Sequence, residues 1–440
     1  MHSNSCKGIR NSHSKSPVGY MTAKRKHYIP LVLLVIAGEV IFALPFHVPR
    51  YFRPSLLESL SITNTQLGDA FAIYGITALL CYFPGGWLAD RFDTRSMLCL
   101  SLFLTAAGGL FLGSFPNPTS MLFLYGYWGT TTILLFWAAL IRTTREWAKA
   151  SEQGIAFGFL DGGRGLIAAI FATIAVFVFA YFSPDSSSEV SERDPRKALE
   201  AVIFAYTLVT FLTAILVWFF MPTNDSKGET NSSFSLSKPR FESPKPSVLL
   251  IALVILCAYT GYKGIDNTAL YLYDVLHFTD KEAAYFAALG TYLRPVSAVL
   301  AGFIADKVAP TKTIFTLFAV LGAAYTAILF ATPSSAAISV IVVGLIVSFT
   351  AVFALRGVYF ALLEESNITK NETGIVVGVV SVIGYSPDIF FGPISGRILD
   401  ASPGVAGHQA YFLLLTCFAV VGLCGVWLLI NSISKQRTKI

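Results

Sequence analysis

Long apolar segments separated by short polar ones dominate this 440-residue chain. A helix needs about 20 apolar residues to cross the bilayer core. The strands of a membrane barrel would be shorter and would alternate strictly. The pattern therefore predicts an all-α membrane protein with twelve transmembrane helices, at residues 29–49, 67–89, 97–115, 120–143, 154–182, 199–221, 248–273, 283–305, 312–332, 336–362, 374–398 and 409–431.

The longest polar segment near the middle of the chain, residues 222–247, is rich in Ser, Pro, Lys and Asn and lacks apolar periodicity. Such a composition is typical of a flexible linker. The expected organisation is a cytoplasmic tail (1–28), a six-helix bundle (29–221), a cytoplasmic linker (222–247), a second six-helix bundle (248–432) and a cytoplasmic tail (433–440).

Lys and Arg are distributed unevenly between the two sides of the predicted membrane. With both termini in the cytoplasm, the inner segments hold about 21 of these bases and the outer loops about six, as the positive-inside rule requires. We therefore expect a multi-pass protein with both termini cytoplasmic, in a bacterial inner membrane.

Composition and motifs exclude several other classes. Only 13% of residues are charged, against about 25% in soluble domains. The net charge of +6 comes from bases scattered over loops and termini, which does not indicate a nucleic-acid partner. No metal-ligand spacing, phosphate-binding loop or nucleophile–base constellation appears, so we expect no metal, no cofactor, no ATP drive and no enzymatic activity.

Two sequence elements recur at nearly half the chain length. Gly86-x-Leu-Ala-Asp90-Arg91 matches Gly302-x-Ile-Ala-Asp306-Lys307, 216 residues later. Glu152-x-Gly-x3-Gly matches Glu372-x-Gly-x3-Gly, 220 residues later. The two matches indicate an internal duplication, and parallel repeats related by an axis along the membrane normal are one known transporter architecture.

The repeated loop motif resembles that of the major facilitator superfamily, although Asp93 stands where the family usually has Gly. The resemblance extends over nearly the whole chain. It implies two pseudo-symmetric six-helix bundles, the major facilitator fold, which alternately open a central site to either side of the membrane.

The loops between the second and third spans of each half are candidates for a conformational latch. Gly86 and Gly302 allow close helix contact. A carboxylate such as Asp90 can pair with a base or receive a helix N-terminus. Ordinary positive-inside topology is the alternative interpretation for Arg91 and Arg95. The predicted latch residues are Gly86, Asp90, Arg91, Arg95, Gly302, Asp306, Lys307, Glu152 and Glu372.

Ionisable side chains inside spans are costly, and they indicate function. Arg294 and Arg356 have no oppositely charged residue near them in the sequence, and the arginine fork fits carboxylate, phosphate or sulfonate groups. Pairing with carboxylates on other helices is the alternative. The predicted substrate-binding residues are Lys263, Arg294, Arg356, Arg164 and Tyr262.

Carboxylates and a histidine inside spans are candidates for proton coupling. Desolvation favours the protonated form of a buried carboxylate such as Glu39, and imidazole titrates near neutral pH. Asp161–Arg164 and Lys263–Asp266, at three-residue spacing, could instead be structural ion pairs. The predicted proton-coupling residues are Glu39, Asp161, Asp266, Asp388 and His47.

Residues 262–278, together with 302–307 and 152–158, are similar to organophosphate/phosphate antiporters and related anion transporters. In that group, bases on the first and seventh spans grip the anionic head. The corresponding bases here are Arg50, which lies close to the outer end, and Lys263, which is shifted by one residue and so turned by about 100°. Because both bases depart from the positions found in the phosphate antiporters, a carboxylate or sulfonate cargo is as consistent with the sequence as a phosphate.

Together these features predict a monomeric secondary transporter that moves a small organic anion (sugar phosphate, carboxylate or sulfonate) by alternating access. Coupling to protons and exchange of substrates are both consistent with the sequence. Two alternatives stay open, namely proton-driven efflux of lipophilic compounds and a receptor or scaffold that does not transport.

Overall fold

The structure is a computed structural model and describes residues 17–147, 153–183, 195–223, 246–331, 335–366 and 373–437. In these ranges every regular element is a helix. The N-terminal half holds α1 (Pro17–Val40), η1 (Ala43–His47), α2 (Val48–Tyr51), α3 (Arg53–Leu60), α4 (Asn64–Arg91), α5 (Thr94–Gly113), α6 (Pro118–Gly129), η2 (Thr130–Trp137), α7 (Ala138–Trp147), α8 (Gln153–Phe182) and α9 (Pro195–Phe220).

The C-terminal half repeats this arrangement of long, apolar helices. It holds α10 (Pro246–Gly264), η3 (Ile265–Asn267), α11 (Thr268–Leu276), α12 (Asp280–Thr291), α13 (Leu293–Val308), α14 (Pro310–Phe330), α15 (Ser335–Val358), α16 (Ala361–Glu365), α17 (Thr373–Gly384), α18 (Pro387–Ala401) and α19 (Val405–Arg437).

Eleven segments of the described chain are long and apolar enough to cross a membrane. The predicted span 374–398 is instead divided into α17 and α18, which are separated by Tyr385 and Ser386. Pro387 explains the break, because proline donates no backbone hydrogen bond and its ring clashes with the preceding turn of a helix. The two helices together cover the length of the predicted span, and the predicted all-α membrane fold is confirmed.

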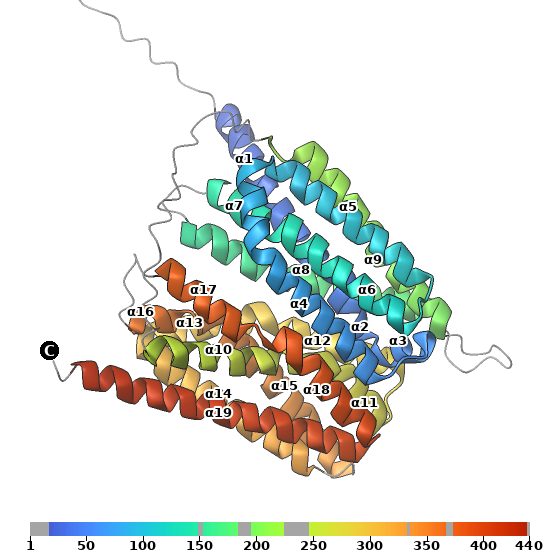
Figure 1. Cartoon of the computed structure of the whole chain (residues 1–440), viewed down its shortest axis with the longest axis vertical. Helices are drawn as coiled ribbons and strands as arrows, with labels where there is room; N and C mark the ends of the chain where they lie inside the picture. The colour runs from blue at the N-terminus through green and yellow to red at the C-terminus, as the bar shows by residue number, and fades with distance from the viewer. Residues whose placement is uncertain are drawn as a thin grey trace, which may run out of the picture.

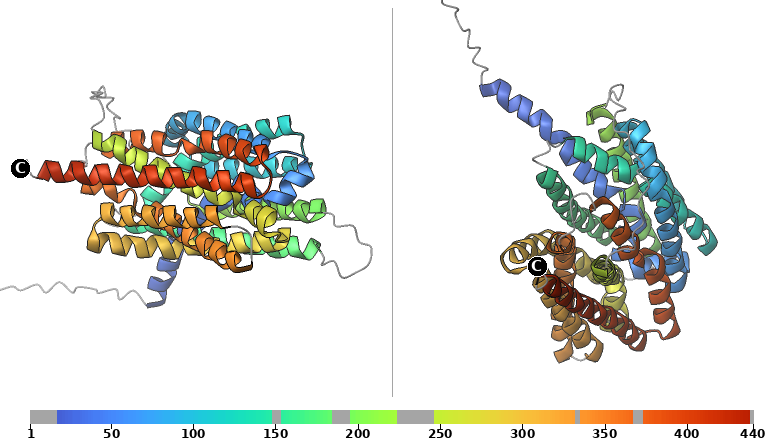
Figure 2. Two further views of the ribbon diagram at one scale, coloured as in Figure 1. Left: turned by 90° about the horizontal axis from the view of Figure 1, so that it is seen from below. Right: turned by 60° about the vertical axis from the view of Figure 1, so that its left-hand side comes forward.

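The two halves form separate bundles that lie side by side (Figures 1 and 2). They meet where α4 packs on α18, where α8 packs on α12 and α13, and where α3 contacts α11. Toward the opposite end α1 and α19 diverge (Figure 1). We call the end at α3 and α11 the closed end; the predicted topology places it on the outer side of the membrane.

Glycines allow α4 and α18 to touch through their backbones at the closed end. A Cβ atom on Gly68 would lie 2.2 Å from the carbonyl oxygen of Gly392. A Cβ atom on Gly396 would lie 2.4 Å from the carbonyl oxygen of Asn64. Both distances are too short for any side chain, so this interface requires glycine.

The first span is interrupted in its C-terminal half. The π-helical segment η1 separates α1 from α2 and contains Pro45. Proline cannot donate the backbone hydrogen bond of a regular helix, and such π-helical segments are frequent at functional sites. The break turns the residues that follow it, including Arg50, relative to the start of the span.

The predicted domain boundaries differ from the helix ends at both termini. Helix α1 begins at Pro17, inside the predicted N-terminal tail, and α19 continues to Arg437. Residues 224–245 of the predicted linker lie outside the described residues. The predicted residue boundaries of the bundles, the linker and the tails stay predictions.

Candidate functional site

One group of charged side chains, the Glu39 cluster, surrounds Glu39 of α1. His47 Nε2 lies 3.2 Å from Glu39 Oε1, and Arg164 Nε of α8 donates to Oε2 at 3.2 Å. Arg294 of α13 approaches Glu39 Oε1 at 3.6 Å and Asp161 of α8 at 3.6 Å. Three predicted proton-coupling residues and two predicted substrate-binding residues therefore lie together.

A second group, the Asp266 cluster, surrounds Asp266 of η3. Arg50 Nε donates to Asp266 Oδ1 at 2.6 Å, and Lys263 Nζ lies 3.3 Å from Oδ2. Lys263 also approaches Asp388 of α18 at 3.4 Å. Arg50 reaches the hydroxyl of Tyr262 at 3.2 Å. The predicted pair Lys263–Asp266 is present, but it is part of a larger network.

Both clusters join the two halves of the chain. In the Glu39 cluster, Arg294 comes from the C-terminal half and pairs with carboxylates of the N-terminal half. In the Asp266 cluster, Arg50 comes from the N-terminal half and pairs with Asp266 of the other half. If the halves separate near these clusters, the two ion pairs break and their charged groups need new partners. A charged ligand can be such a partner.

Arg356 of α15 differs from the other buried bases. Its guanidinium lies over the Tyr262 ring at 3.8 Å and over the Tyr259 ring at 5.7 Å. Its Nη1 is buried and has no hydrogen-bond partner, and Arg356 forms no ion pair with any carboxylate that the structure describes. An arginine that lies over aromatic rings and has a free donor is suited to bind an oxyanion.

The carboxylates of the two clusters differ in their access to solvent. The side chains of Glu39 and Asp266 are 5% and 6% exposed. Those of Asp388 and Asp161 are 26% and 69% exposed. Only the last two can exchange a proton directly with water in this conformation.

Glu39 is surrounded by bases. Two arginines and a histidine lie within 3.6 Å of its carboxylate. Glu39 is therefore a counter-ion for these bases in this conformation, and its predicted role in proton coupling stays a prediction.

Sequence reasoning missed or misjudged several residues near the site. Arg50 is only 6% exposed and sits in the Asp266 cluster, because η1 redirects the first span. Tyr259 donates to both carboxylate oxygens of Asp388, and its ring packs against Tyr385. Arg53 is 2% exposed. Proline at 45, 49 and 54 was the available signal for an irregular first span.

Part of the predicted latch lies within the described residues, and its role as a latch stays a prediction. No atom lies within 4 Å of a Cβ built on Gly86 or Gly302, so these glycines make no close helix contact. Asp90, Asp306 and Lys307 are exposed and have no ion pair within the part of the chain that the structure describes.

The remaining latch residues have other surroundings. Arg91 lies 3.9 Å from the ring of Trp87. Arg95 lies 4.6 Å from the ring of Trp218. Glu152 and Glu372 lie outside the described residues.

Comparisons with known proteins agree with this architecture. Residues 33–392 match the profile of the Major Facilitator Superfamily. The inner membrane proteins YihN and YqcE of Escherichia coli (strain K12) are 26% and 28% identical to the chain, over 94% and 88% of its length and 97% and 91% of theirs. A D-galactonate transporter of Escherichia coli O6:H1 (strain CFT073) is 23% identical over 37% of each chain.

Solved structures share the fold at low sequence identity. A bacterial homologue of the human lysosomal transporter Spinster, in an inward-facing and occupied conformation, superimposes with a TM-score of 0.68 at 15% identity, over 95% of this chain and 98% of that one. The chain is therefore an integral membrane transporter that belongs to the Major Facilitator Superfamily.

Proposed function

We propose that the protein transports a small organic anion with a carboxylate, sulfonate or phosphate group. The observation that carries this proposal is Arg356, a base between the two clusters that has a buried free donor and no carboxylate partner among the described residues. The other buried bases of the clusters already have carboxylates within 3.6 Å. Arg356 is thus the cation that an incoming anion can neutralise without displacing a native ion pair.

The proposed site places the anionic group against Arg356 and Tyr262. The Tyr262 hydroxyl already accepts from Arg50, so it links the ligand to the Asp266 cluster. A polyhydroxylated acid also has hydroxyl groups that can bond Tyr259 and Tyr385. Transport of D-galactonate by a partial relative supports this class of cargo.

The same geometry supports the proposal of alternating access. The ion pairs Arg50–Asp266 and Arg294–Glu39 hold the halves together near the site, and the cargo competes for these bases when the halves rock. We assign proton exchange to Asp161, because its side chain is 69% exposed and lies 3.6 Å from Arg294. Protonation of Asp161 would remove one of the two carboxylates that hold Arg294, leave Glu39 as the other, and so weaken this contact between the halves when a proton binds.

Ligand binding to purified protein tests the proposal. D-galactonate, D-glucarate, a sugar phosphate and an alkyl sulfonate are screened by calorimetry and by thermal stabilisation. At least one should bind, and Arg356→Gln should weaken that binding by about 10- to 100-fold, as expected for loss of a hydrogen bond to a charged group.

Lys312→Gln is the matched control, because Lys312 is an exposed base at the start of α14. It should leave the affinity unchanged. Stabilisation only by neutral or cationic compounds would overturn the proposal, and so would an anion that binds Arg356→Gln and the native protein equally well.

A further inference from the structure

Asp388 places a carboxylate beside the proposed cargo site. It is the second residue of α18, and its side chain is 26% exposed. The Tyr259 hydroxyl lies 3.1 and 3.0 Å from its two oxygens, and the Tyr259 ring faces the guanidinium of Arg356 at 5.7 Å. One tyrosine side chain thus contacts both groups. A cargo with its acid group at Arg356 therefore has the Asp388 carboxylate within the length of this side chain.

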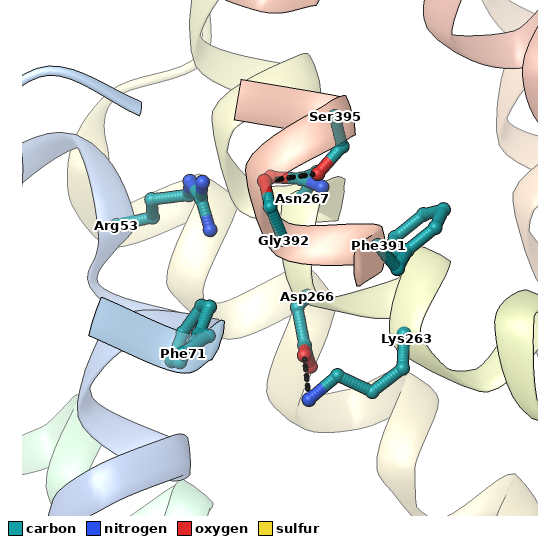
Figure 3. A pocket seen from close by; sticks show the side chains of 8 residues that line it. All are labelled: Arg53, Phe71, Lys263, Asp266, Asn267, Phe391, Gly392 and Ser395. Atoms are coloured by element: carbon teal, nitrogen blue, oxygen red, sulfur yellow. Dashed lines mark hydrogen bonds and ion pairs between the residues drawn. The ribbon is translucent and has the colours of Figure 1, made fainter. Parts of the chain in front are cut away.

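The base that pairs with Asp388 is out of reach of a cargo. Lys263 Nζ lies 3.4 Å from Asp388 and 3.3 Å from Asp266, and the Lys263 side chain is only 5% exposed. The rings of Phe46 and Phe71 lie 4.7 and 5.2 Å from the ammonium. The pocket beside Lys263 has room for about one water molecule (Figure 3). Lys263 therefore pairs with Asp388 from the buried side and cannot bind a second acid group of the cargo.

A second accessible carboxylate comes from the opposite half. Asp161 of α8 has a side chain that is 69% exposed, and it lies close enough to Arg356 for the two charges to interact. The most exposed carboxylates of the two clusters, Asp161 and Asp388, therefore both lie near Arg356. An ionised carboxylate accepts hydrogen bonds and repels another negative charge. Next to the acid group of the cargo, this environment favours hydroxyl groups over a second acid group.

Arg164 of α8 is the rival partner for a second acid group. Its terminal nitrogens make no hydrogen bond within the described chain. However, Glu39 already pairs with Arg164 at 3.2 Å, and the Arg164 side chain is only 13% exposed. Asp161, three residues earlier, shares a face of the helix with it. A second acid group at Arg164 would therefore lie beside the negative charge of Asp161.

We infer that the protein selects a polyhydroxylated monocarboxylate over the corresponding dicarboxylate, and that Asp388 determines this specificity. The inference rests on the proposed anion site at Arg356 and adds the chemistry of the rest of the cargo. Asp388 accepts a hydrogen bond from a cargo hydroxyl group, and it repels a carboxylate in the same place. This role acts in cargo binding and is distinct from the proton coupling predicted for Asp388 from the sequence.

Three acids with one carbon skeleton test the selection. D-galactonate, D-fuconate and galactarate end in a hydroxymethyl, a methyl and a carboxylate group, and both acid groups of galactarate are ionised at pH 7. Their binding to the purified full-length protein is measured by calorimetry. D-galactonate should bind most tightly. D-fuconate should bind about 10-fold more weakly, because it lacks a hydrogen bond to a charged group. Galactarate should bind at least 10-fold more weakly, because two negative charges would face each other.

Asp388→Asn distinguishes charge repulsion from structural damage. The amide has no negative charge and offers a donor to a carboxylate, and Lys263 keeps Asp266 as its partner. Galactarate should therefore gain about 10-fold in affinity relative to D-galactonate, whereas structural damage would weaken both acids together. Asp306→Asn is the control, because Asp306 is an exposed carboxylate without an ion pair in the described chain. It should keep the native order of affinities.

The order of affinities in the native protein decides the inference even if Asp388→Asn does not fold. The inference is overturned if galactarate binds as tightly as D-galactonate, which would place its second acid group at a base such as Arg164. Equal binding of D-fuconate and D-galactonate would overturn it too, and so would a native order of affinities in folded Asp388→Asn.

A failure of this inference is distinguishable from a failure of the proposed function. If another anion binds at Arg356 but none of the three acids does, the selection for a polyhydroxylated monocarboxylate is wrong and anion transport stands. If no anion binds at all, the proposed function fails, and the inference fails with it.

Discussion

At the scale of single residues, three ion pairs of the two clusters join the halves of the chain, namely Arg50–Asp266, Arg294–Glu39 and Arg294–Asp161. The Arg50–Asp266 pair is the shortest of these contacts, at 2.6 Å, and both side chains are at least nine-tenths buried. Removal of one member of a buried pair is much more damaging than removal of both, because the remaining charge stays desolvated.

Arg50→Gln should therefore destabilise the protein by about 3 kcal/mol, seen as a lower unfolding midpoint in detergent. The double variant Arg50→Gln/Asp266→Asn should recover part of this loss. Arg397→Gln is the control, because its pair with Asp69 is exposed and is worth at most about 1 kcal/mol. A single variant as stable as the double variant would contradict this account.

The two carboxylates that face Arg294 differ in their exposure to solvent. Asp161 is exposed and Glu39 is not. Asp161→Asn should therefore abolish the dependence of anion uptake on pH, whereas Glu39→Gln should reduce the rate at every pH and keep the profile. Uptake into proteoliposomes from about pH 5 to pH 8, where most proteins are stable, checks this. The opposite result would restore Glu39 as the proton carrier.

At the scale of helices, the apolar pattern predicted where the spans lie but not the breaks within them. The apolar runs predicted every long helix, because about 20 apolar residues fix a span regardless of its neighbours. The π-helical break in the first span and the division into α17 and α18 depend on how prolines are accommodated by packing. The burial of Arg50 beside Asp266 did not follow from its predicted position close to the end of the first span.

The candidate site was predictable in its composition but not in its pairing. Charges inside spans identified Glu39, Asp161, Arg164, Lys263, Asp266, Arg294, Arg356 and Asp388 without any structure. Most of them pair with side chains on other helices, which no sequence spacing relates; Lys263–Asp266, at three-residue spacing, is the exception among the described residues. Arg53 follows a span directly and was indistinguishable from an ordinary loop base.

The α4–α18 contact provides a test at the same scale. Gly68→Ala should separate these helices, because the new Cβ would meet the carbonyl oxygen of Gly392 at 2.2 Å. The population open at the closed end should increase, measured as faster labelling by a membrane-impermeant maleimide of a cysteine introduced at Ser395, in a background without native cysteines.

Gly322→Ala in α14 is the matched control for this variant. Its Cβ would make only an ordinary contact, 3.7 Å from the Cβ of Ala419. Labelling should remain at the native rate. If Gly68→Ala also labels at the native rate, backbone contact between α4 and α18 does not hold the closed end.

At the scale of the whole molecule, the closed end is fastened by contacts between the halves that are remote from the cargo site. Asp400, at the end of α18, accepts hydrogen bonds from the backbone N–H groups of Asn64 at 3.1 Å and Thr65 at 2.7 Å. It thus caps the N-terminus of α4, where partial positive charge collects. Nearby, Arg397 of α18 pairs with Asp69 of α4 at 2.9 Å.

The cap makes closure dependent on the charge of Asp400. Burial raises its pKa, but the hydrogen bonds from Thr65 and Asn64 outweigh burial and hold the pKa below its ordinary value. A carboxylate with a lowered pKa stabilises the capped state above the ordinary pKa of about 3.9 and loses this effect as pH falls through the lowered pKa. The closed end should therefore be stable near neutral pH and weaken only in strong acid.

Asp400→Asn should reproduce the effect of acid at neutral pH. Loss of a charged cap costs about 1 kcal/mol, which is about a fivefold shift toward opening.

Spin labels at the exposed positions Ser61 and Ser402 report the separation of the halves by pulsed electron paramagnetic resonance. The native protein should show one short distance at neutral pH, and the variant should gain a longer one. Asp306→Asn is the control, because Asp306 is an exposed carboxylate without an ion pair in the described chain. This control should show the same distances as the native protein. If the native protein, Asp400→Asn and Asp306→Asn all give the same distance distribution, the glycine interface alone closes this end.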